Sequence, residues 1–273
     1  MPLARVTFLG TGTSHGVPMI GCRCAVCRSN DSRDRRLRPS IHLDVADGPA
    51  LLVDTSTDLR QQALTHDLTR VDAVLFTHSH ADHVMGLDEL RRFNARKGSG
   101  IPVYADGATG AELGRIFAYA FSAPSGAGGG VPELALTVID GPFVVDGVTV
   151  VPVPILHGRR PILGFRVGNF AYLTDCSAIP ESSYALLDGL DILVLDALRH
   201  RPHPTHFTVT EAVAAATRIG ARQTYFTHIC HDLPHAATCA ALPVGMALAH
   251  DGLVVTIDTQ GTPAGLAVRA GQA

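Results

Sequence analysis

The sequence predicts an α/β fold, a four-layer sandwich in which two sheets pack face to face and helices cover both outer faces. Three observations lead to this prediction. The 273 residues are enough for a large core and lie within the range of one α/β domain. Short apolar runs of strand length alternate with runs of helical periodicity along the chain. Both halves are rich in strands, and neither a strict repeat nor a linker divides them, so we expect a single domain over residues 1–273.

The first half begins with strands and then alternates strands with helices. Short apolar runs predict strands over residues 5–9, 41–45, 50–53, 71–76 and 101–104. Apolar residues spaced three or four apart predict helices over residues 59–68, 85–97 and 111–121. Residues 122–130 contain four glycines and a proline, so we expect a loop there.

The second half repeats this alternation. Strands are predicted over residues 136–139, 143–145, 149–154, 163–167, 171–174, 191–195, 223–226 and 253–257. The runs on either side of Gly168 and Asn169 predict a hairpin across that pair. A helix is predicted over residues 209–219, with Thr208 or Thr210 as its N-cap and Glu211 in its first turn.

Composition and charge narrow the function classes. Lys and Arg number 22 against 25 Asp and Glu, a net charge of −3, so the chain lacks the basic excess of a typical nucleic-acid binder. No apolar run approaches the roughly 20 residues that cross a membrane, and the N-terminal residues carry no signal-peptide pattern. We therefore expect a cytoplasmic protein without a membrane partner. Three of the six cysteines fall within residues 22–27, which favours metal binding over a disulfide framework.

The most informative motif lies directly after the strand expected at 71–76. Three imidazoles and one carboxylate occur within six residues there, from His78, His80, Asp82 and His83. Imidazole and carboxylate together suit Zn, Mn or Fe, and four such groups are too many for one closed structural site. The motif therefore predicts one part of a two-metal hydrolytic centre, and a solvated histidine-rich loop is the weaker reading.

Three further candidates each follow an expected strand. His157 comes after residues 151–156, Asp175 after residues 170–174 and His228 after residues 224–227. Each alone is equally well read as a turn residue. Because strand ends gather at one edge of a sheet, we expect these groups to converge with the histidine cluster.

The sequence from Thr77 to His83 resembles the His-x-His-x-Asp-His signature of the metallo-β-lactamase superfamily, and the resemblance covers essentially the whole chain. It implies an αββα sandwich with two catalytic divalent metals. The implied ligands are His78, His80 and His157 for one metal and Asp82, His83 and His228 for the other, with Asp175 bridging them. An Asp at 175 points toward the phosphodiesterase-like members, and Cys176 is expected to serve packing.

A second metal site is predicted at the cysteine-rich loop. Cys22, Cys24 and Cys27 are spaced closely enough to bind one structural zinc, which usually takes four ligands. The fourth ligand is either His231, which we prefer because it lies three residues after His228, or Cys230. Free buried thiols are the weaker reading.

Residues 10–18, together with the cysteine triplet, resemble a narrower group, the cyclic-phosphate phosphodiesterases of bacterial phosphonate breakdown. That resemblance implies hydrolysis of a small, cyclic phosphodiester by attack of a metal-bound hydroxide. It also implies a catalytic role for His206 in the Thr-His-Phe segment, and we expect Asp82 to be catalytic as well as a ligand. Asp196 is expected either to orient a neighbouring group or to form a plain turn, and Asp54 to orient the loop that carries the histidine cluster.

Three other functions stay open at this point. A tRNA 3′-processing endonuclease of the same superfamily would need a basic arm, which the composition of residues 122–153 does not supply. A metal-dependent oxygenase-like enzyme of quinone-cofactor biosynthesis shares the cysteine-triplet theme. A non-catalytic metal-binding scaffold is disfavoured because every ligand position is occupied. The sequence leaves open the substrate, the choice of Mn or Zn in the catalytic pair, and whether the chain forms a homodimer.

Overall fold

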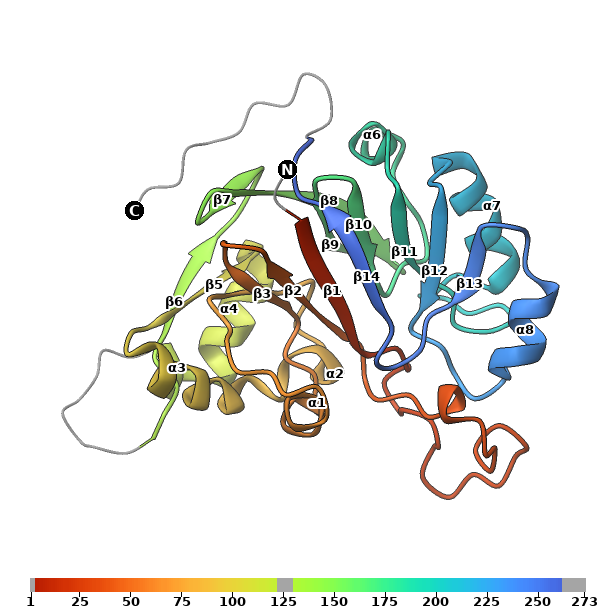
Figure 1. Cartoon of the computed structure of the whole chain (residues 1–273), viewed down its shortest axis with the longest axis horizontal. Helices are drawn as coiled ribbons and strands as arrows, with labels where there is room; N and C mark the ends of the chain where they lie inside the picture. Colours follow the sequence, from red (N-terminus) through yellow and green to blue (C-terminus); the bar gives the residue numbers. More distant parts are fainter. Residues whose placement is uncertain (1–2, 122–129, 262–273) are drawn as a thin grey trace.

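The computed structural model describes residues 3–121 and 130–261, and within these ranges it contains two seven-stranded sheets that pack against each other. The strand order is β14-β1-β2-β3-β4-β5-β6 in the first sheet and β13-β12-β11-β10-β9-β8-β7 in the second. Helices lie on the outer face of each sheet (Figure 1). The four-layer sandwich predicted from the sequence is therefore confirmed, and the loop expected at 122–130 lies almost wholly outside the described residues.

The first sheet is antiparallel on one side and parallel on the other. Its strands are β1 (Leu3–Gly10), β2 (Ser40–Val45), β3 (Ala50–Val53), β4 (Ala73–Leu75), β5 (Ile101–Ala105), β6 (Leu134–Val138) and β14 (Val254–Asp258). Strands β14, β1, β2 and β3 pair antiparallel, and β3 to β6 pair parallel. Its helical elements are α1 (Leu59–Thr65), α2 (Ala81–Val84), η2 (Leu87–Leu90), α3 (Arg91–Lys97), α4 (Gly107–Ile116) and α5 (Ala118–Phe121). A further 3-10 turn, η1 (Ser32–Asp34), lies in the loop between β1 and β2 and contacts the start of α8 (His235–Ala241).

The second sheet has the same mixed character. Its strands are β7 (Phe143–Val145), β8 (Val148–His157), β9 (Arg160–Val167), β10 (Phe170–Leu173), β11 (Ile192–Asp196), β12 (Gln223–Thr227) and β13 (Met246–Leu248). Strands β7 to β10 pair antiparallel and β10 to β13 pair parallel. Its helical elements are α6 (Glu181–Tyr184), η3 (Ala185–Leu187), α7 (Val209–Ile219) and α8 (His235–Ala241).

Alternate side chains of the central strands belong to different cores. In β3, Leu51 and Val53 pack between the two sheets, whereas Leu52 packs under the helices of the first sheet. In β10, Tyr172 faces the core between the sheets and Leu173 faces the helices of the second sheet. Because a strand directs successive side chains to opposite faces, strands covered on both sides read as continuous apolar runs. This burial fixes the strands whose ends carry the site.

Several predicted elements differ in extent. The helix expected at 85–97 is divided into η2 and α3 and is preceded by α2. The helix expected at 111–121 begins at Gly107, because the Asp106 carboxylate caps it by accepting from Thr109 N at 2.6 Å, and it breaks at Phe117. Helix α7 has the predicted bounds, and Thr208 and Glu211 form a capping box. The short elements α6, α8 and β13 were not predicted.

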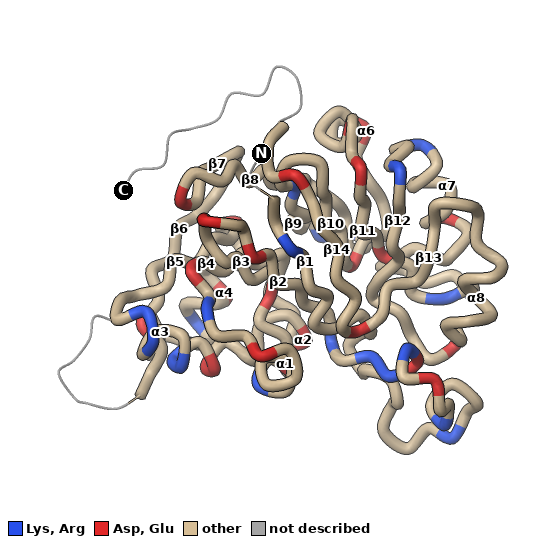
Figure 2. Tube along the Cα trace, in the orientation of Figure 1, with Lys and Arg blue, Asp and Glu red and all other residues tan. Residues whose placement is uncertain are grey.

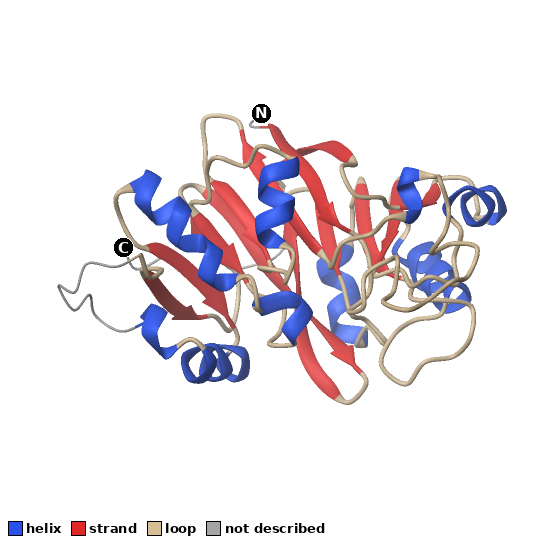
Figure 3. Cartoon of the chain, turned by 90° about the horizontal axis from the view of Figure 1, so that it is seen from below, coloured by secondary structure: helices blue, strands red, loops and turns tan. Residues whose placement is uncertain are grey.

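Charged residues are interspersed over both halves, with several Lys and Arg residues near α3 (Figure 2). Seen from below, the helices of the first sheet lie across its strands (Figure 3). The long cysteine-rich loop lies on the side of the second sheet, below β13 and α8 in Figure 1. Within the described part of the chain, no helix combines the length and the apolar character needed to span a membrane.

Candidate metal centre

Strand ends bring the predicted ligands of the catalytic centre together. His78 and His80 follow β4, Asp175 follows β10, and His228 comes directly after β12, while His157 is the last residue of β8. The donor atoms form two groups, in each of which all atoms lie within 4.8 Å of one another. One group is His78, His80, His157 and Asp175, and the other is Asp82, His83, Asp175 and His228.

The backbone turns sharply at three of these strand ends. Asp54, Asp175 and His228 have φ values of 61°, 56° and 58°. This left-handed region is uncommon outside glycine, although Asp and His tolerate it better than most residues. The turn directs each of the three side chains into the buried space at the edge of the sheets, and all three are at most 2% exposed.

Hydrogen bonds donated by Nδ1 orient the buried imidazoles. His83 Nδ1 donates to Asp54 Oδ2 at 2.7 Å, and His78 Nδ1 to Thr77 Oγ1 at 3.0 Å. His157 Nδ1 lies 2.8 Å from the carbonyl oxygen of Thr205. With Nδ1 as the donor, each ring presents the lone pair of Nε2 to the cluster.

The unsatisfied Nε2 atoms fit bound cations. The Nε2 atoms of His78, His83 and His228 are buried and have no hydrogen-bond partner among the described residues. His83 Nε2 lies 3.1 Å from Asp175 Oδ1 and 3.4 Å from Asp82 Oδ2, and His228 Nε2 lies 3.3 Å from Asp175 Oδ2. Two ligands with bonds of about 2.1 Å to one tetrahedral cation are separated by about 3.4 Å. The donor set and its spacing therefore suit two divalent cations with Asp175 between them.

Burial and neighbouring charges act strongly on these groups. Burial, together with the neighbouring His83, places the pKa of His78 well below its usual value. Burial alone would raise the pKa of Asp175, but His228 and His83 hold it well below its usual range. Asp175 therefore stays ionised and His78 neutral, which are the forms that bind a cation.

His206 lies against this cluster. Its ring stacks on that of His228 with centroids 4.6 Å apart and planes inclined by 12°, and it lies 4.7 Å from the ring of His157. His206 Nδ1 donates to Asp196 Oδ2 at 2.7 Å. Asp196 ends β11 and is fully buried, so it orients His206 rather than forming a plain turn. The catalytic roles of His206 and Asp82 remain predictions.

The cysteine-rich loop forms a separate group with His231. The Sγ atoms of Cys22, Cys24 and Cys27 lie 3.2, 3.5 and 3.6 Å from His231 Nδ1. Zinc bonds of about 2.3 Å to sulfur and 2.05 Å to nitrogen at the tetrahedral angle predict about 3.5 Å. A backbone hydrogen bond from Cys27 lowers the pKa of the Cys24 thiol to about 6, which favours the thiolate that binds metal.

Cys230 does not join that group. Its Sγ lies 3.3 Å from Asp232 N, from which it accepts a hydrogen bond. Of the two candidates left open by the sequence, the geometry therefore favours His231. Cys176 packs in the core beneath the helices of the second sheet, as predicted.

Two contacts of the site were not predicted. Arg160, the first residue of β9, donates to Ser79 Oγ at 2.9 Å and so fixes the segment between His78 and His80. Asp54 also accepts from Thr77 N at 2.9 Å and from Thr77 Oγ1 at 2.8 Å. The resemblance to the superfamily indicated the orienting role of Asp54, but nothing in the sequence indicated its partners.

Comparisons with known proteins agree with this geometry. A family model described as "Beta-lactamase superfamily domain" matches residues 50–229. The crystal structure of a new diphosphatase from the PhnP family is 46% identical, has a TM-score of 0.88, and covers 94% of this chain and 98% of that one. Zn²⁺-bound PqqB from Methylobacterium extorquens is 22% identical with a TM-score of 0.77 over 92% of this chain and 99% of that one, a likeness of fold alone.

A curated relative shares most of this chain's length. "Octanoyltransferase" from Porphyromonas gingivalis is 38% identical over 259 residues, which are 94% of this chain and 52% of the relative. The chain thus spans about half the length of that relative.

Proposed function

This chain belongs to the metallo-β-lactamase superfamily and is a hydrolase of that fold; we propose that it hydrolyses a small phosphodiester or diphosphate linkage. The observation that carries the proposal is the pair of four-residue donor groups that share Asp175. The likeness to a diphosphatase of the PhnP family, which is 46% identical over nearly the whole chain, supports the same class of substrate. A cyclic phosphodiester, as the sequence resemblance implies, is one member of that class.

We assign the two donor groups to a pair of divalent cations, Zn or Mn. His78, His80 and His157 would hold one cation, and Asp82, His83 and His228 the other, with Asp175 between them. When bound, such a pair would supply Lewis acidity toward phosphoryl oxygens and would lower the pKa of a nucleophilic water. We assign one structural zinc to Cys22, Cys24, Cys27 and His231.

We assign His206 the role of a proton donor rather than that of a metal ligand. Its Nδ1 is 2.7 Å from Asp196 Oδ2, a hydrogen-bond distance that leaves no room for a cation between the two atoms. With Asp196 holding Nδ1–H, the opposite nitrogen, Nε2, can carry a proton toward the departing oxygen of the substrate. General acids of this kind typically contribute about 10²–10⁴-fold to rate. An anionic phosphate beside the ring would favour the protonated imidazolium.

Octanoyl transfer is not carried over to this chain. The relative with that name extends well beyond the matched stretch, which makes up 52% of its length. A histidine–carboxylate centre that suits two divalent cations favours attack by water on a phosphoryl group.

A reconstituted activity panel tests the proposal. The protein is stripped of metal, reloaded with Zn²⁺ or Mn²⁺, and assayed on a cyclic nucleotide, a linear diester, a dinucleoside diphosphate, a precursor tRNA and octanoyl-coenzyme A. We expect turnover of at least one of the three small phosphate substrates and its loss in Asp175→Ala. His66→Ala, a histidine outside both donor groups, is the matched control. Cleavage of precursor tRNA or octanoyl-coenzyme A alone would contradict the proposal.

A further inference from the structure

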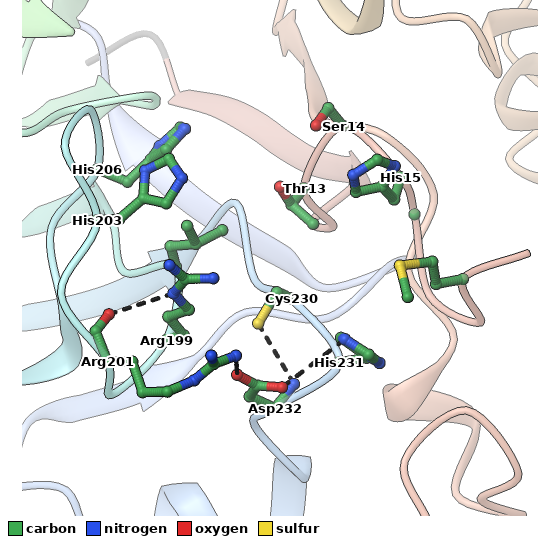
Figure 4. A pocket seen from close by; sticks show the side chains of 13 residues that line it. Thr13, Ser14, His15, Arg199, Arg201, His203, His206, Cys230, His231 and Asp232 are labelled. Carbon is green, nitrogen blue, oxygen red and sulfur yellow. Dashed lines mark hydrogen bonds and ion pairs between the residues drawn. The ribbon is translucent and has the colours of Figure 1, made fainter. Parts of the chain in front are cut away.

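A cavity of about 270 Å³ lies between the histidine–carboxylate cluster and the cysteine-rich loop (Figure 4). His206 forms part of its wall on one side, and His231 forms part of the other. The cavity therefore borders the catalytic cluster and the thiolate group at once. Its volume is slightly below the roughly 300–1,000 Å³ of pockets for drug-sized ligands, so it suits a compact group rather than a whole nucleotide.

Arg199 supplies a rigidly held positive charge on this wall. Its Nε donates to the carbonyl oxygen of Arg201 at 3.2 Å, and its Nη2 donates to that of Pro202 at 3.1 Å. Its own carbonyl accepts from Val209 N at 3.0 Å, at the start of α7. Both acceptors of the guanidinium are neutral, and no carboxylate in residues 3–121 or 130–261 forms an ion pair with it. Three of its five N–H groups remain for a ligand.

The rest of the described lining offers Arg199 no direct ion pair, although the charge of Arg199 does act on Asp232. Asp232 is the single carboxylate among the described residues that line the cavity, and Arg201 pairs with it at 2.8 Å. Across the cavity, Ser14 and His15 face Arg199 from the loop after β1 (Figure 4). Both are exposed, and neither makes a hydrogen bond to another described residue, so their polar groups can serve as additional donors. A guanidinium with neutral donors opposite it is suited to a phosphate.

We infer that this cavity binds a second phosphate of the substrate, on the leaving-group side of the scissile bond, with Arg199 as its charge partner. The inference rests on the proposed function and extends it. The position follows from His206, which lines the cavity and is also the residue assigned to the departing oxygen. The second phosphate has two chemical sources: the far half of a diphosphate linkage, or a phosphomonoester elsewhere on a sugar.

Two substrate pairs distinguish these sources. The first is adenosine 2′,3′-cyclic phosphate with and without a 5′-phosphate. The second is diadenosine 5′,5′-diphosphate and diadenosine 5′,5′-monophosphate. For each pair, kcat/KM of the metal-loaded enzyme is measured, and the ratio within the pair is compared between the wild type and Arg199→Gln. We expect Arg199→Gln to lower that ratio about 10–100-fold in at least one pair, as loss of hydrogen bonds to a charged group predicts.

Controls separate a binding role from a structural one. Arg199→Lys keeps the charge without the fork of N–H groups and is expected to restore part of the ratio. Arg115→Gln, which removes a surface arginine paired with Glu112 on α4, is expected to leave the ratio at the wild-type value. Metal content and the melting temperature are measured for each variant.

Two outcomes would overturn the inference. Ratios in Arg199→Gln within threefold of the wild type in both pairs would refute the phosphate site while leaving the proposed function intact. If the wild-type enzyme hydrolyses none of the four compounds, the proposed function fails, and the inference falls with it.

Discussion

The carboxylate of Asp54 offers the sharpest test of how the site is held. It is fully buried, and its two oxygens accept three hydrogen bonds: Oδ1 from Thr77 N, and Oδ2 from Thr77 Oγ1 and His83 Nδ1. Asp54→Asn keeps the shape but replaces one acceptor oxygen by an NH₂ donor. In the place of Oδ1, the new donor would face the fixed N–H of Thr77. In the place of Oδ2, it would face the N–H of His83.

Either orientation carries a cost that follows from these contacts. Facing Thr77, the amide loses a hydrogen bond to a charged acceptor, which is worth about 1.5–3 kcal/mol of stability. Facing His83, it draws the ring into the other tautomer, with the proton on Nε2, the atom that points into the cluster. Loss of such an orienting partner typically weakens metal binding about 10–100-fold, which is about 1.4–2.7 kcal/mol. We expect this loss of affinity for a catalytic cation in Asp54→Asn.

Competition with a chelator measures the metal affinity of the wild type and of Asp54→Asn, and urea unfolding measures their stability. Asp44→Asn is the matched control, because the Asp44 carboxylate is partly exposed and pairs with Arg70 at 3.0 Å on the surface. Surface pairs of that kind contribute about 0–1 kcal/mol. Metal affinity and stability in Asp54→Asn that both match Asp44→Asn would refute the orienting role of Asp54.

Three further predictions address other parts of the molecule. His206→Gln is expected to lower kcat on a diester with a poor leaving group about 10²–10⁴-fold at full metal content. The loss of kcat on a 4-nitrophenyl ester, which has a good leaving group, should be much smaller. Equal losses on both substrates would contradict a proton-donating role. His231→Ala is expected to lose one zinc per chain by elemental analysis and to melt at a lower temperature, whereas Cys230→Ala keeps that zinc; the reverse result would make Cys230 the fourth ligand. Burial raises the pKa of Asp251 from 3.8 to about 7, so the folded protein binds this proton more tightly than the unfolded chain. The tighter binding of this proton stabilises the folded state by at most about 4 kcal/mol; this stability is fully present below about pH 4 and is lost as the pH rises through 7. Urea unfolding between pH 4 and 8 should show this fall in the free energy of unfolding in the wild type and not in Asp251→Asn. Parallel curves for the two proteins would disprove the prediction.

Much of the fold was predictable because the central strands of both sheets are buried on both faces and therefore read as continuous apolar runs in the sequence. Strands β3 and β7 have the predicted bounds, and the hairpin across Gly168 and Asn169 is present. The errors lie where local chemistry decides. Helix α4 begins four residues before the expected start because the Asp106 carboxylate caps it, and a count of apolar positions does not register a cap. Helix α8 spans seven residues with little apolar periodicity, so it left no pattern to detect.

The sequence alone was enough to place His157, Asp175 and His228 at strand ends and the cysteine triplet in one loop, because both follow from local spacing. The choice between His231 and Cys230 required the tertiary structure. Arg36, almost fully buried, donates to the carbonyl oxygens of Cys230 at 3.0 Å and Leu233 at 2.8 Å, some 194 and 197 residues away in the sequence. These contacts hold the turn that presents the His231 ring to the three thiols. The cavity beside His206 arises in the same way, from loops far apart in the chain, because side chains that meet only after packing leave no trace in sequence spacing.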